Sequence, residues 1–306
     1  MKNIFKIMGA AAVSLMILAS CDQENVKSLY TPEQDNEVSF PATVYTNTEI
    51  PADVTSIDII ITRNSANGSI TVPLTTNLPS EISVPAEVAF QDGAYEAAIS
   101  LGLAIQGGVR YTGSISVADS AYFNAKTSPY PTINITLQQA YNWVPLEGNG
   151  QWWCNMITHP NIVSVQVYEA TNSTTPRYRI MNPFPDEVLQ PFADGQGGRI
   201  DNSNRSEYIE FAHLTDETGA VSPLISFNTY YPGVTINVGE DGEGPVEGVY
   251  SADYAKDCAL IMDNVYQFYP FYQFTTSTGA TYSWGSAYSA YLSLPGGPDL
   301  AELLGI

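Results

Sequence analysis

The chain has 306 residues, of which 32 are acidic and 11 are basic, so its formal net charge is −21. Such a charge repels the phosphate backbone of nucleic acids and argues against a nucleic-acid partner. The length suits two domains of ordinary size. With 20 tyrosines, 23 glycines and 20 prolines, the composition is typical of an exported all-β protein with many turns.

The first 20 residues have the order of parts found in an export signal. Lys2 and Lys6 carry positive charge, and an uncharged apolar run follows at residues 7–20, too short to cross a bilayer as a helix. The run ends with small residues and a cysteine, in Leu18-Ala19-Ser20-Cys21. We therefore exclude residues 1–20 from the folded domains.

Leu18-Ala19-Ser20-Cys21 resembles the lipobox of bacterial lipoproteins. The resemblance implies that a signal peptidase cuts before Cys21, which then receives diacylglycerol and a further acyl chain on its new amino group, with palmitate among the acyl chains. Several chains on one residue should anchor firmly, since a single chain gives only marginal, reversible binding. An ordinary signal peptide with a chance cysteine, or a buried N-terminal helix, is the alternative.

Residues 21–36 are expected to form a lipidated tether, because they are polar and acidic with little apolar content. Asp22-Gln23-Glu24-Asn25 resembles the acidic export signals of Bacteroidetes lipoproteins that are displayed on the cell surface. The resemblance implies an outer-membrane protein that is attached by its lipid and faces outward. A plain solvated tether on a periplasm-facing protein is the alternative.

Residues 37–140 predict a β-sandwich, because short β-rich runs alternate with turn residues. Asn67-Gly68 lies between two of these runs and is a strong hairpin signal. No amphipathic helix of three turns is evident. Strands are expected at residues 38–40, 57–62, 70–72, 84–90, 95–103, 111–117 and 132–137.

Ile59-Ile60-Ile61-Thr62-Arg63, Ile70-Thr71-Val72-Pro73 and Ala97-Ala98-Ile99-Ser100-Leu101 resemble strands of the Calx-β and immunoglobulin-like domains of bacterial surface proteins. The resemblance implies an immunoglobulin-like fold for residues 37–140. Calcium-binding members carry clustered carboxylates in the loops at one end, but Leu103-Ala104-Ile105-Gln106-Gly107-Gly108 has none. Because a hard cation needs several oxygen ligands, calcium is not carried over to this domain.

Three residues after the tether are candidates for covalent modification. Asp119-Ser120-Ala121 resembles the short O-glycosylation motif of Bacteroidetes, with Ser120 as the acceptor. A disulfide between Cys154 and Cys258 closes a loop of roughly 100 residues, which stabilises by about 4–5 kcal/mol in the chain-entropy model. Two separate buried thiols are the alternative, and the sequence leaves both open.

Residues 141–306 predict a second antiparallel β domain. Valines alternate with polar residues at 163–167, which is the pattern of a half-buried strand. Trp143, Gly148 and Gly150, followed by Tyr178-Arg179-Ile180-Met181-Asn182-Pro183-Phe184, resemble a C-terminal module that recurs in Bacteroidetes lipoproteins, many of them associated with glycan-utilisation loci. Further strands are expected at residues 178–181, 208–211, 224–228, 234–238, 260–265 and 271–276.

No nucleophile elbow, phosphate-binding loop, dinucleotide-binding turn or zinc-protease motif occurs in the sequence, so neither a catalytic centre nor a cofactor is expected. His159 precedes a proline in a turn and His213 ends a strand, and the two histidines and two cysteines lack the spacing of zinc ligands. A glycosidase needs only two carboxylates that flank a sugar. A glycoside-directed enzyme therefore stays open as an alternative.

Two charged groups in the second domain are candidate ligand contacts. Glu240, Asp241 and Glu243 lie in a glycine-rich acidic loop and are the candidate metal ligands, although their spacing is not that of an EF-hand. A mobile solvated turn is the alternative for this loop. Arg177 and Arg179 face the same side of a strand, and either contact a ligand or tie the strand to nearby carboxylates.

The aromatic run at residues 266–274 is the main indication of a binding function. Strand alternation places Tyr266 and Phe268 on one face, and Tyr272 and Phe274 share a face beyond a proline. Exposed rings stack on the apolar faces of sugars, and the alternative places the rings in the core. The predicted glycan contacts are Trp152, Trp153, Tyr266, Phe268, Tyr272 and Trp284.

Together these expectations describe a non-catalytic, lipid-anchored outer-membrane protein made of two β-sandwich domains. The first domain is a spacer, and the second binds polysaccharide as an accessory of outer-membrane uptake proteins. A structural or adhesive surface protein that binds protein partners is one alternative, and the glycoside-directed enzyme is the other.

Overall fold

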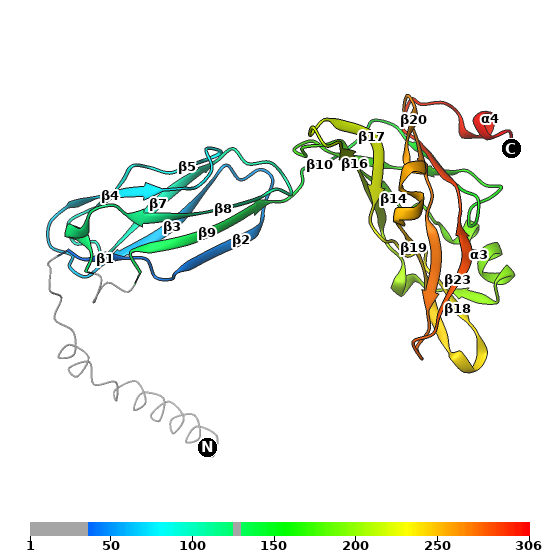
Figure 1. Ribbon diagram of the computed structural model, residues 1–306, viewed down its shortest axis with the longest axis horizontal. Helices are drawn as coiled ribbons and strands as arrows, with labels where there is room; N and C mark the ends of the chain where they lie inside the picture. The colour runs from blue at the N-terminus through cyan, green and yellow to red at the C-terminus, as the bar shows by residue number, and fades with distance from the viewer. Residues whose placement is uncertain (1–35, 125–129) are drawn as a thin grey trace, which may run out of the picture. The chain divides into compact units, whose positions relative to one another are not determined.

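The computed structural model in Figure 1 describes residues 36–124 and 130–306. Cys21 and the export signal lie outside the described residues. The chain divides into two compact units, and the main division falls between Gln138 and Gln139, where the sequence analysis placed it after residue 140. The first unit comprises the described residues up to Ile50 with Val54–Ile105 and Arg110–Gln138, and the second comprises Pro51–Asp53, Gln106–Val109 and Gln139–Ile306.

The first unit consists of two antiparallel sheets, which confirms the predicted all-β fold. The four-stranded sheet has the order β1-β3-β7-β5, and the five-stranded sheet has the order β2-β9-β8-β4-β6. The strands are β1 (Val38–Ser39), β2 (Val44–Ile50), β3 (Ser56–Arg63), β4 (Ile70–Thr76), β5 (Ile82–Ser83), β6 (Glu87–Phe90), β7 (Glu96–Leu103), β8 (Arg110–Val117) and β9 (Thr132–Gln139).

Alternating burial along the strands builds the core of this unit. On β3, Ile59 and Ile61 are buried, whereas Ile60 between them is 41% exposed. β7 pairs with β3 and places buried Ile99 directly opposite Ile59. Because side chains alternate between the two faces of a strand, one apolar face of each sheet packs into the core.

Two strands of the first unit differ from the sequence prediction. β2 was missed, because most of its side chains are at least partly exposed and it lacks the alternating apolar pattern. Residues 84–90 were predicted as one strand, but only β6 lies within this region, and β5 ends just before it, on the other side of Pro85. β5 pairs with β7 and β6 pairs with β4, so the chain crosses from one sheet to the other at this proline.

The second unit contains a ten-stranded antiparallel sheet in the order β10-β13-β14-β16-β17-β20-β21-β24-β11-β12. β12 is the edge strand at one end of the sheet, and β13 is the second strand from the other end. Only Gln166 separates these two strands in the chain. The sheet must therefore curve round until its two sides meet. Its strands are β10 (Trp143–Pro145), β11 (Gly150–Cys154), β12 (Val163–Val165), β13 (Val167–Ala170), β14 (Arg177–Met181), β16 (Tyr208–Thr215), β17 (Val221–Phe227), β20 (Ala259–Met262), β21 (Val265–Phe268) and β24 (Ala290–Ser293).

A five-stranded sheet in the order β15-β18-β19-β22-β23 completes the second unit. Tyr269-Pro270 separates β21 from β22, and Tyr288-Ser289 separates β23 from β24, so one bent hairpin belongs to both sheets. The aromatic run of the sequence lies in this hairpin. The strands of the sheet are β15 (Gly198–Ile200), β18 (Val234–Asn237), β19 (Glu243–Val249), β22 (Phe271–Thr275) and β23 (Thr281–Ala287).

The second unit also contains two helices that the sequence analysis did not predict, α3 (Asp186–Gly195) and α4 (Leu300–Leu304). α3 packs against β15 and β18 with Val188, Leu189, Phe192 and Ala193 buried. It is hard to recognise because Pro191 lies inside it and its N-cap, Pro185, offers no side-chain hydrogen bond. Within the described part of the chain, every helix is too short or too polar to cross a membrane.

Candidate functional site

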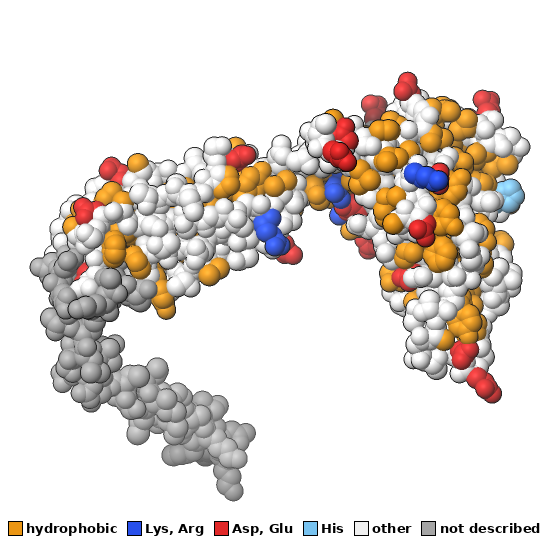
Figure 2. All heavy atoms as spheres, in the orientation of Figure 1, with side chains coloured by type: hydrophobic (Ala, Val, Ile, Leu, Met, Phe, Trp, Pro, Cys, Tyr) orange, Lys and Arg blue, Asp and Glu red, His pale blue; other side chains and the backbone are white. Residues whose placement is uncertain are grey.

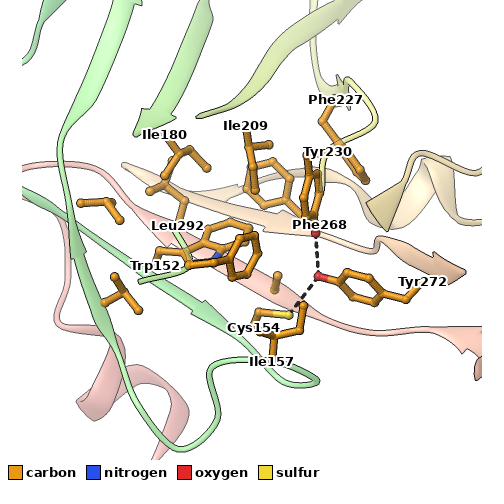
Figure 3. Close-up of a cluster of buried hydrophobic side chains, with 14 of the residues drawn as sticks. Trp152, Cys154, Ile157, Ile180, Ile209, Phe227, Tyr230, Phe268, Tyr272 and Leu292 are labelled. Atoms are coloured by element: carbon orange, nitrogen blue, oxygen red, sulfur yellow. Dashed lines mark hydrogen bonds between the residues drawn. The ribbon is translucent and has the colours of Figure 1, made fainter. Parts of the chain in front are cut away.

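Five of the six predicted glycan contacts lie in the core of the second unit, so the prediction was wrong for them. Trp152, Trp153, Tyr266, Phe268 and Tyr272 are all buried, with exposed fractions of 0–6%. The bent hairpin that carries the aromatic run belongs to both sheets, and its rings fill the space between them (Figure 3). Trp284 differs from the other five, because it is only partly buried.

The adjacent residues Trp152 and Trp153 are both buried because both faces of β11 are covered. Trp152 points into the main core, where it packs edge-on against Phe268 with ring centroids 5.4 Å apart. Trp153 points the other way and packs with Val265 of β21 and Leu300 of α4. The C-terminal helix thus covers a sheet face that the sequence analysis left open.

A chain of hydrogen bonds links three polar side chains in the centre of the core (Figure 3). The Cys154 Sγ atom lies 3.2 Å from the Tyr272 hydroxyl, which lies 2.6 Å from the Tyr230 hydroxyl. Burial raises the pKa of all three groups. They are therefore neutral at physiological pH and satisfy each other's hydrogen bonds rather than those of a ligand.

Of the two alternatives that the sequence left open for Cys154 and Cys258, the structure shows two separate buried thiols and no disulfide between them. Cys154 lies in β11 and Cys258 immediately precedes β20, and β24 and β21 lie between these strands in the sheet. Three strand spacings correspond to about 14 Å along the sheet, whereas a disulfide needs Cα atoms within about 7 Å.

The acidic loop does not gather its carboxylates around a common point. Asp241 accepts a hydrogen bond from the Tyr282 hydroxyl, whereas Glu243 begins β19 and pairs with Arg199 at 2.9 Å. Across residues 36–124 and 130–306, no group of three or more metal-binding side chains occurs. Asp241 and Glu243, which the sequence suggested as metal ligands, therefore have separate partners and do not form a common site.

His213 is held inside the second unit by two polar partners. Its Nδ1 atom lies 2.7 Å from the Ser222 carbonyl oxygen, and its Nε2 atom lies 3.0 Å from the Tyr266 hydroxyl. Both ring nitrogens are thereby occupied within the fold. The imidazole is a structural element and not part of an open site.

Arg177 and Arg179 share one carboxylate, which gives them a structural role. Their guanidinium groups bind the two oxygens of Glu210 at 2.7 and 2.9 Å. Arg179 also lies between the rings of Trp143 and Tyr208, 4.0 Å from each centroid. These contacts tie β10, β14 and β16 together. Of the two roles considered for this pair, the structure therefore supports the tie to a nearby carboxylate.

The candidate O-glycosylation residue lies on the surface of the first unit. Ser120 begins the short 3₁₀ helix η1 (Ser120–Tyr122), and its side chain is exposed. The carboxylate of Asp119 accepts a hydrogen bond from the backbone N–H of Ala121 at 2.8 Å and fixes this turn. The hydroxyl is accessible, and its modification stays a prediction.

An open site of the second unit lies between α3 and the segment that joins β11 to β12. It consists of two adjoining cavities of about 610 and 310 Å³, which we call the α3 groove. Asn161 and Val188 line both cavities. The larger is also lined by Ile162, Val163, Ser164, Asn182, Pro185 and Glu187, and the smaller by Met156, Ile157, His159, Pro160, Pro191, Phe192, Gly195 and Gln196.

One wall of the α3 groove is fixed by a tight turn after β11. The Thr158 hydroxyl accepts a hydrogen bond from the Cys154 backbone N–H at 2.7 Å, and the Thr158 N–H donates to the Cys154 carbonyl at 3.0 Å. The Asn161 N–H then donates to the Thr158 carbonyl at 2.6 Å. Trp153 supports this wall from within the unit, since its ring packs edge-on against His159 at 5.8 Å. His159 and Asn161 are therefore presented on a rigid turn.

The opposite wall depends on a sharp change of chain direction after β14. Asn182 has a φ of 45°, in the left-handed region that asparagine adopts more readily than most residues. Its backbone N–H donates to the Glu207 carbonyl at 2.8 Å, which holds the turn. The chain then enters α3, whose first turn places the exposed side chain of Glu187 beside the larger cavity.

Trp284 lies beside the end of the groove that contains the smaller cavity. Its ring packs against Phe192 at 6.1 Å, and its Nε1–H donates to the Gln196 Oε1 atom at 3.2 Å. Both Phe192 and Gln196 line the smaller cavity. Of the rings chosen from the sequence, Trp284 is the one that combines partial exposure with contacts to this site.

The polar residues of the α3 groove were missed by the sequence analysis. Asn161, Asn182, Glu187 and Gln196 carry the amide and carboxylate groups that line it. Asn161 and Asn182 occur in segments with proline, which the sequence marks as turns. The chain has many such turns, and only the fold shows which of them meet.

Comparisons with known proteins find similarity in structure only. No family model and no curated protein matches the sequence. A protein of unknown function from Bacteroides ovatus is 9% identical, with a TM-score of 0.33 over 87% of this chain and 92% of that chain. An auxiliary nutrient binding protein from Bacteroides thetaiotaomicron is 9% identical, with a TM-score of 0.31 over 83% of this chain and 89% of that chain. These similarities assign no family to the chain.

Proposed function

We propose that this protein is a non-catalytic, lipid-anchored surface protein that binds glycan in the α3 groove, as an accessory of outer-membrane polysaccharide uptake. The anchor is Cys21, at the end of a segment with the charge and apolar length of an export signal. The first unit is a spacer, and the second carries the binding site.

The observation that carries the proposal is the composition and size of the α3 groove. Cavities of about 610 and 310 Å³ lie within the range of small-ligand sites, which is about 300–1,000 Å³. Val188 and Pro160 supply apolar surface, while Asn161, Asn182 and Gln196 supply amides that both donate and accept hydrogen bonds. Sugars present the matching pattern, because each hydroxyl donates and accepts and the ring carries apolar C–H faces.

The lining of the groove favours binding over cleavage. Glycoside hydrolysis uses two carboxyl groups that flank the scissile bond. The two cavities are lined by one carboxylate, that of Glu187, together with amides, a hydroxyl and the imidazole of His159. These groups suffice to orient a sugar by hydrogen bonds.

Asn161→Ala and Trp284→Ala should each weaken glycan binding by about tenfold, which corresponds to about 1.4 kcal/mol. Asn161 lines both cavities, and Trp284 holds Gln196 at the end of the smaller one. Affinity electrophoresis through gels that contain neutral polysaccharides measures the effect. Asn228→Ala is the matched control, since Asn228 is exposed and lies outside the groove. Wild-type protein that is folded but is retarded by no polysaccharide in the panel contradicts the proposal.

Cys21→Ala should abolish acylation and move the protein out of the membrane fraction, because the acyl chains on Cys21 are the proposed anchor. Fractionation of cells grown with labelled palmitate measures both effects. Lys27→Ala, in the same tether but beyond the acylated residue, should remain labelled and membrane-bound. A Cys21→Ala product that still carries label and sediments with membranes rules out this anchor.

A further inference from the structure

The formal charge of the α3 groove is negative, with the imidazole of His159 counted as neutral. Glu187 lines the larger cavity, and neither lysine nor arginine is among the residues that line the two cavities. Asp186, the neighbour of Glu187 in the first turn of α3, pairs with Arg205 at 2.6 Å. That guanidinium is therefore already engaged by a carboxylate beside the groove.

Apart from Lys256, which is exposed in the segment before β20, the rest of the second unit adds only four arginines as positive charge to offset Glu187. All four of its arginines are engaged with carboxylates of the protein: Arg177 and Arg179 with Glu210, Arg199 with Asp201 and Glu243, and Arg205 with Asp186. On the face drawn in Figure 2, basic side chains are few and acidic ones are scattered over both units. The net charge of the whole chain is −21. An anionic ligand thus meets repulsion both on approach and inside the site.

We infer that the α3 groove selects uncharged glycans and rejects glycans that carry uronic acid or sulfate groups. This inference rests on the proposed function and specifies its ligand. Amide side chains such as Asn161 and Asn182 match neutral hydroxyls, which donate and accept hydrogen bonds. A sugar carboxylate or sulfate only accepts, and tight binding of such a group uses arginine, lysine or clustered backbone N–H donors. The larger cavity does border the N-terminus of α3, which attracts negative charge, but the carboxylates of Asp186 and Glu187 already occupy its first turn and place like charge beside an anionic sugar.

The experiment compares neutral and charged forms of one polysaccharide. A panel of glucan, mannan, arabinoxylan, polygalacturonate and chondroitin sulfate first identifies the polymers that full-length protein retards in affinity gels. A retained neutral polymer is then partly carboxymethylated, which adds negative charge, or partly hydroxyethylated to the same degree, which adds bulk without charge. Carboxymethylation should weaken binding at least tenfold at low salt, and hydroxyethylation should change it by less than about threefold. Added salt should reduce the difference between the affinities for the carboxymethylated and the hydroxyethylated polymer, since it screens the repulsion.

Charge reversal at one residue assigns the selectivity to the groove. Glu187→Lys should reduce or invert the preference for the neutral over the carboxymethylated polymer, whatever its effect on the neutral affinity. Glu217→Lys makes the same change of net charge on an exposed turn outside the groove and should leave the preference as it is in the wild type. The preference is a ratio of two affinities, so it separates charge selection from a general loss of binding.

The outcomes distinguish this inference from the proposed function. Tighter retention by the acidic polymers, or a preference that Glu187→Lys leaves unchanged in folded protein, overturns the inference while glycan binding stands. Equal retention of neutral and acidic polymers likewise overturns the inference on charge selection and leaves glycan binding intact. Absence of retention by every polymer, neutral and acidic, removes the proposed function and this inference together.

Discussion

Arg63→Ala is expected to lower the free energy of unfolding of the first unit by about 3–4 kcal/mol. Arg63 is 4% exposed, and its guanidinium group donates four hydrogen bonds to backbone carbonyls, at 2.6–3.0 Å. It also lies over the ring of Phe90, 5.3 Å from the centroid. Alanine leaves these carbonyls without their charged donor and removes the packing on the ring. The four acceptors are the carbonyls of Ala66, Gly68, Gln91 and Ala94.

Calorimetry is the suitable measurement for Arg63→Ala, because the four tryptophans of the chain all lie in the second unit and their fluorescence does not report on the first. Arg110→Ala is the matched control: Arg110 is exposed on β8, and its loss should change stability by less than about 0.5 kcal/mol. Arg63→Lys should recover only part of the stability. The compact ammonium group of lysine lacks the forked N–H donors with which the guanidinium group reaches several carbonyls at once. Equal stability of the Arg63→Ala and Arg110→Ala variants contradicts the role assigned to Arg63.

Trp152→Ala is expected to destabilise the second unit by about 3–5 kcal/mol. Trp152 is completely buried and packs edge-on against Phe184 and Phe268, with centroids 6.1 and 5.4 Å away. Its removal opens a large cavity between the two sheets that share the bent hairpin. Trp152→Phe should cost less, because a ring remains and the indole N–H has no hydrogen-bond partner among the described residues.

Trp284→Ala is the matched comparison for Trp152→Ala, since both residues were predicted from the sequence to contact glycan. Trp284 is partly exposed, so its loss should cost less stability than the loss of Trp152 and should act mainly on binding. Urea unfolding followed by the fluorescence of the remaining tryptophans measures both variants. A Trp152→Ala variant with unchanged stability and no glycan binding contradicts the assignment of Trp152 to the core and of Trp284 to the binding site.

The fold class was predictable because it depends on local patterns. The alternation of apolar and polar residues around Ile59, Ile61 and Ile99 is enough to define half-buried strands. β2 and α3 were not predictable from the same signals. β2 is mostly exposed and has no apolar alternation, and α3 contains Pro191 and lacks a capping side chain. Their formation depends on partners elsewhere in the chain.

The candidate site was predictable only in part, through Trp284. Strand alternation says which rings share a face, but it does not say whether that face is covered. Tyr266 and Tyr272 are buried because the hairpin that carries them bends between two sheets, and Trp153 is buried because α4 crosses its face. The anchor at Cys21 lies outside the described residues and stays a prediction, as does the Calx-β-like character of the first unit.

By itself, the sequence determined an all-β chain of two domains with a strong excess of acidic side chains, since composition, periodicity and charge are properties of neighbouring residues. Only the tertiary structure decided that the two cysteines are apart, that the aromatic run is core, and that Asn161, Asn182 and Glu187 line one groove. The physical reason is that burial and proximity arise from pairings between distant strands, such as β11 with β24 and β14 with β16, which no local pattern encodes.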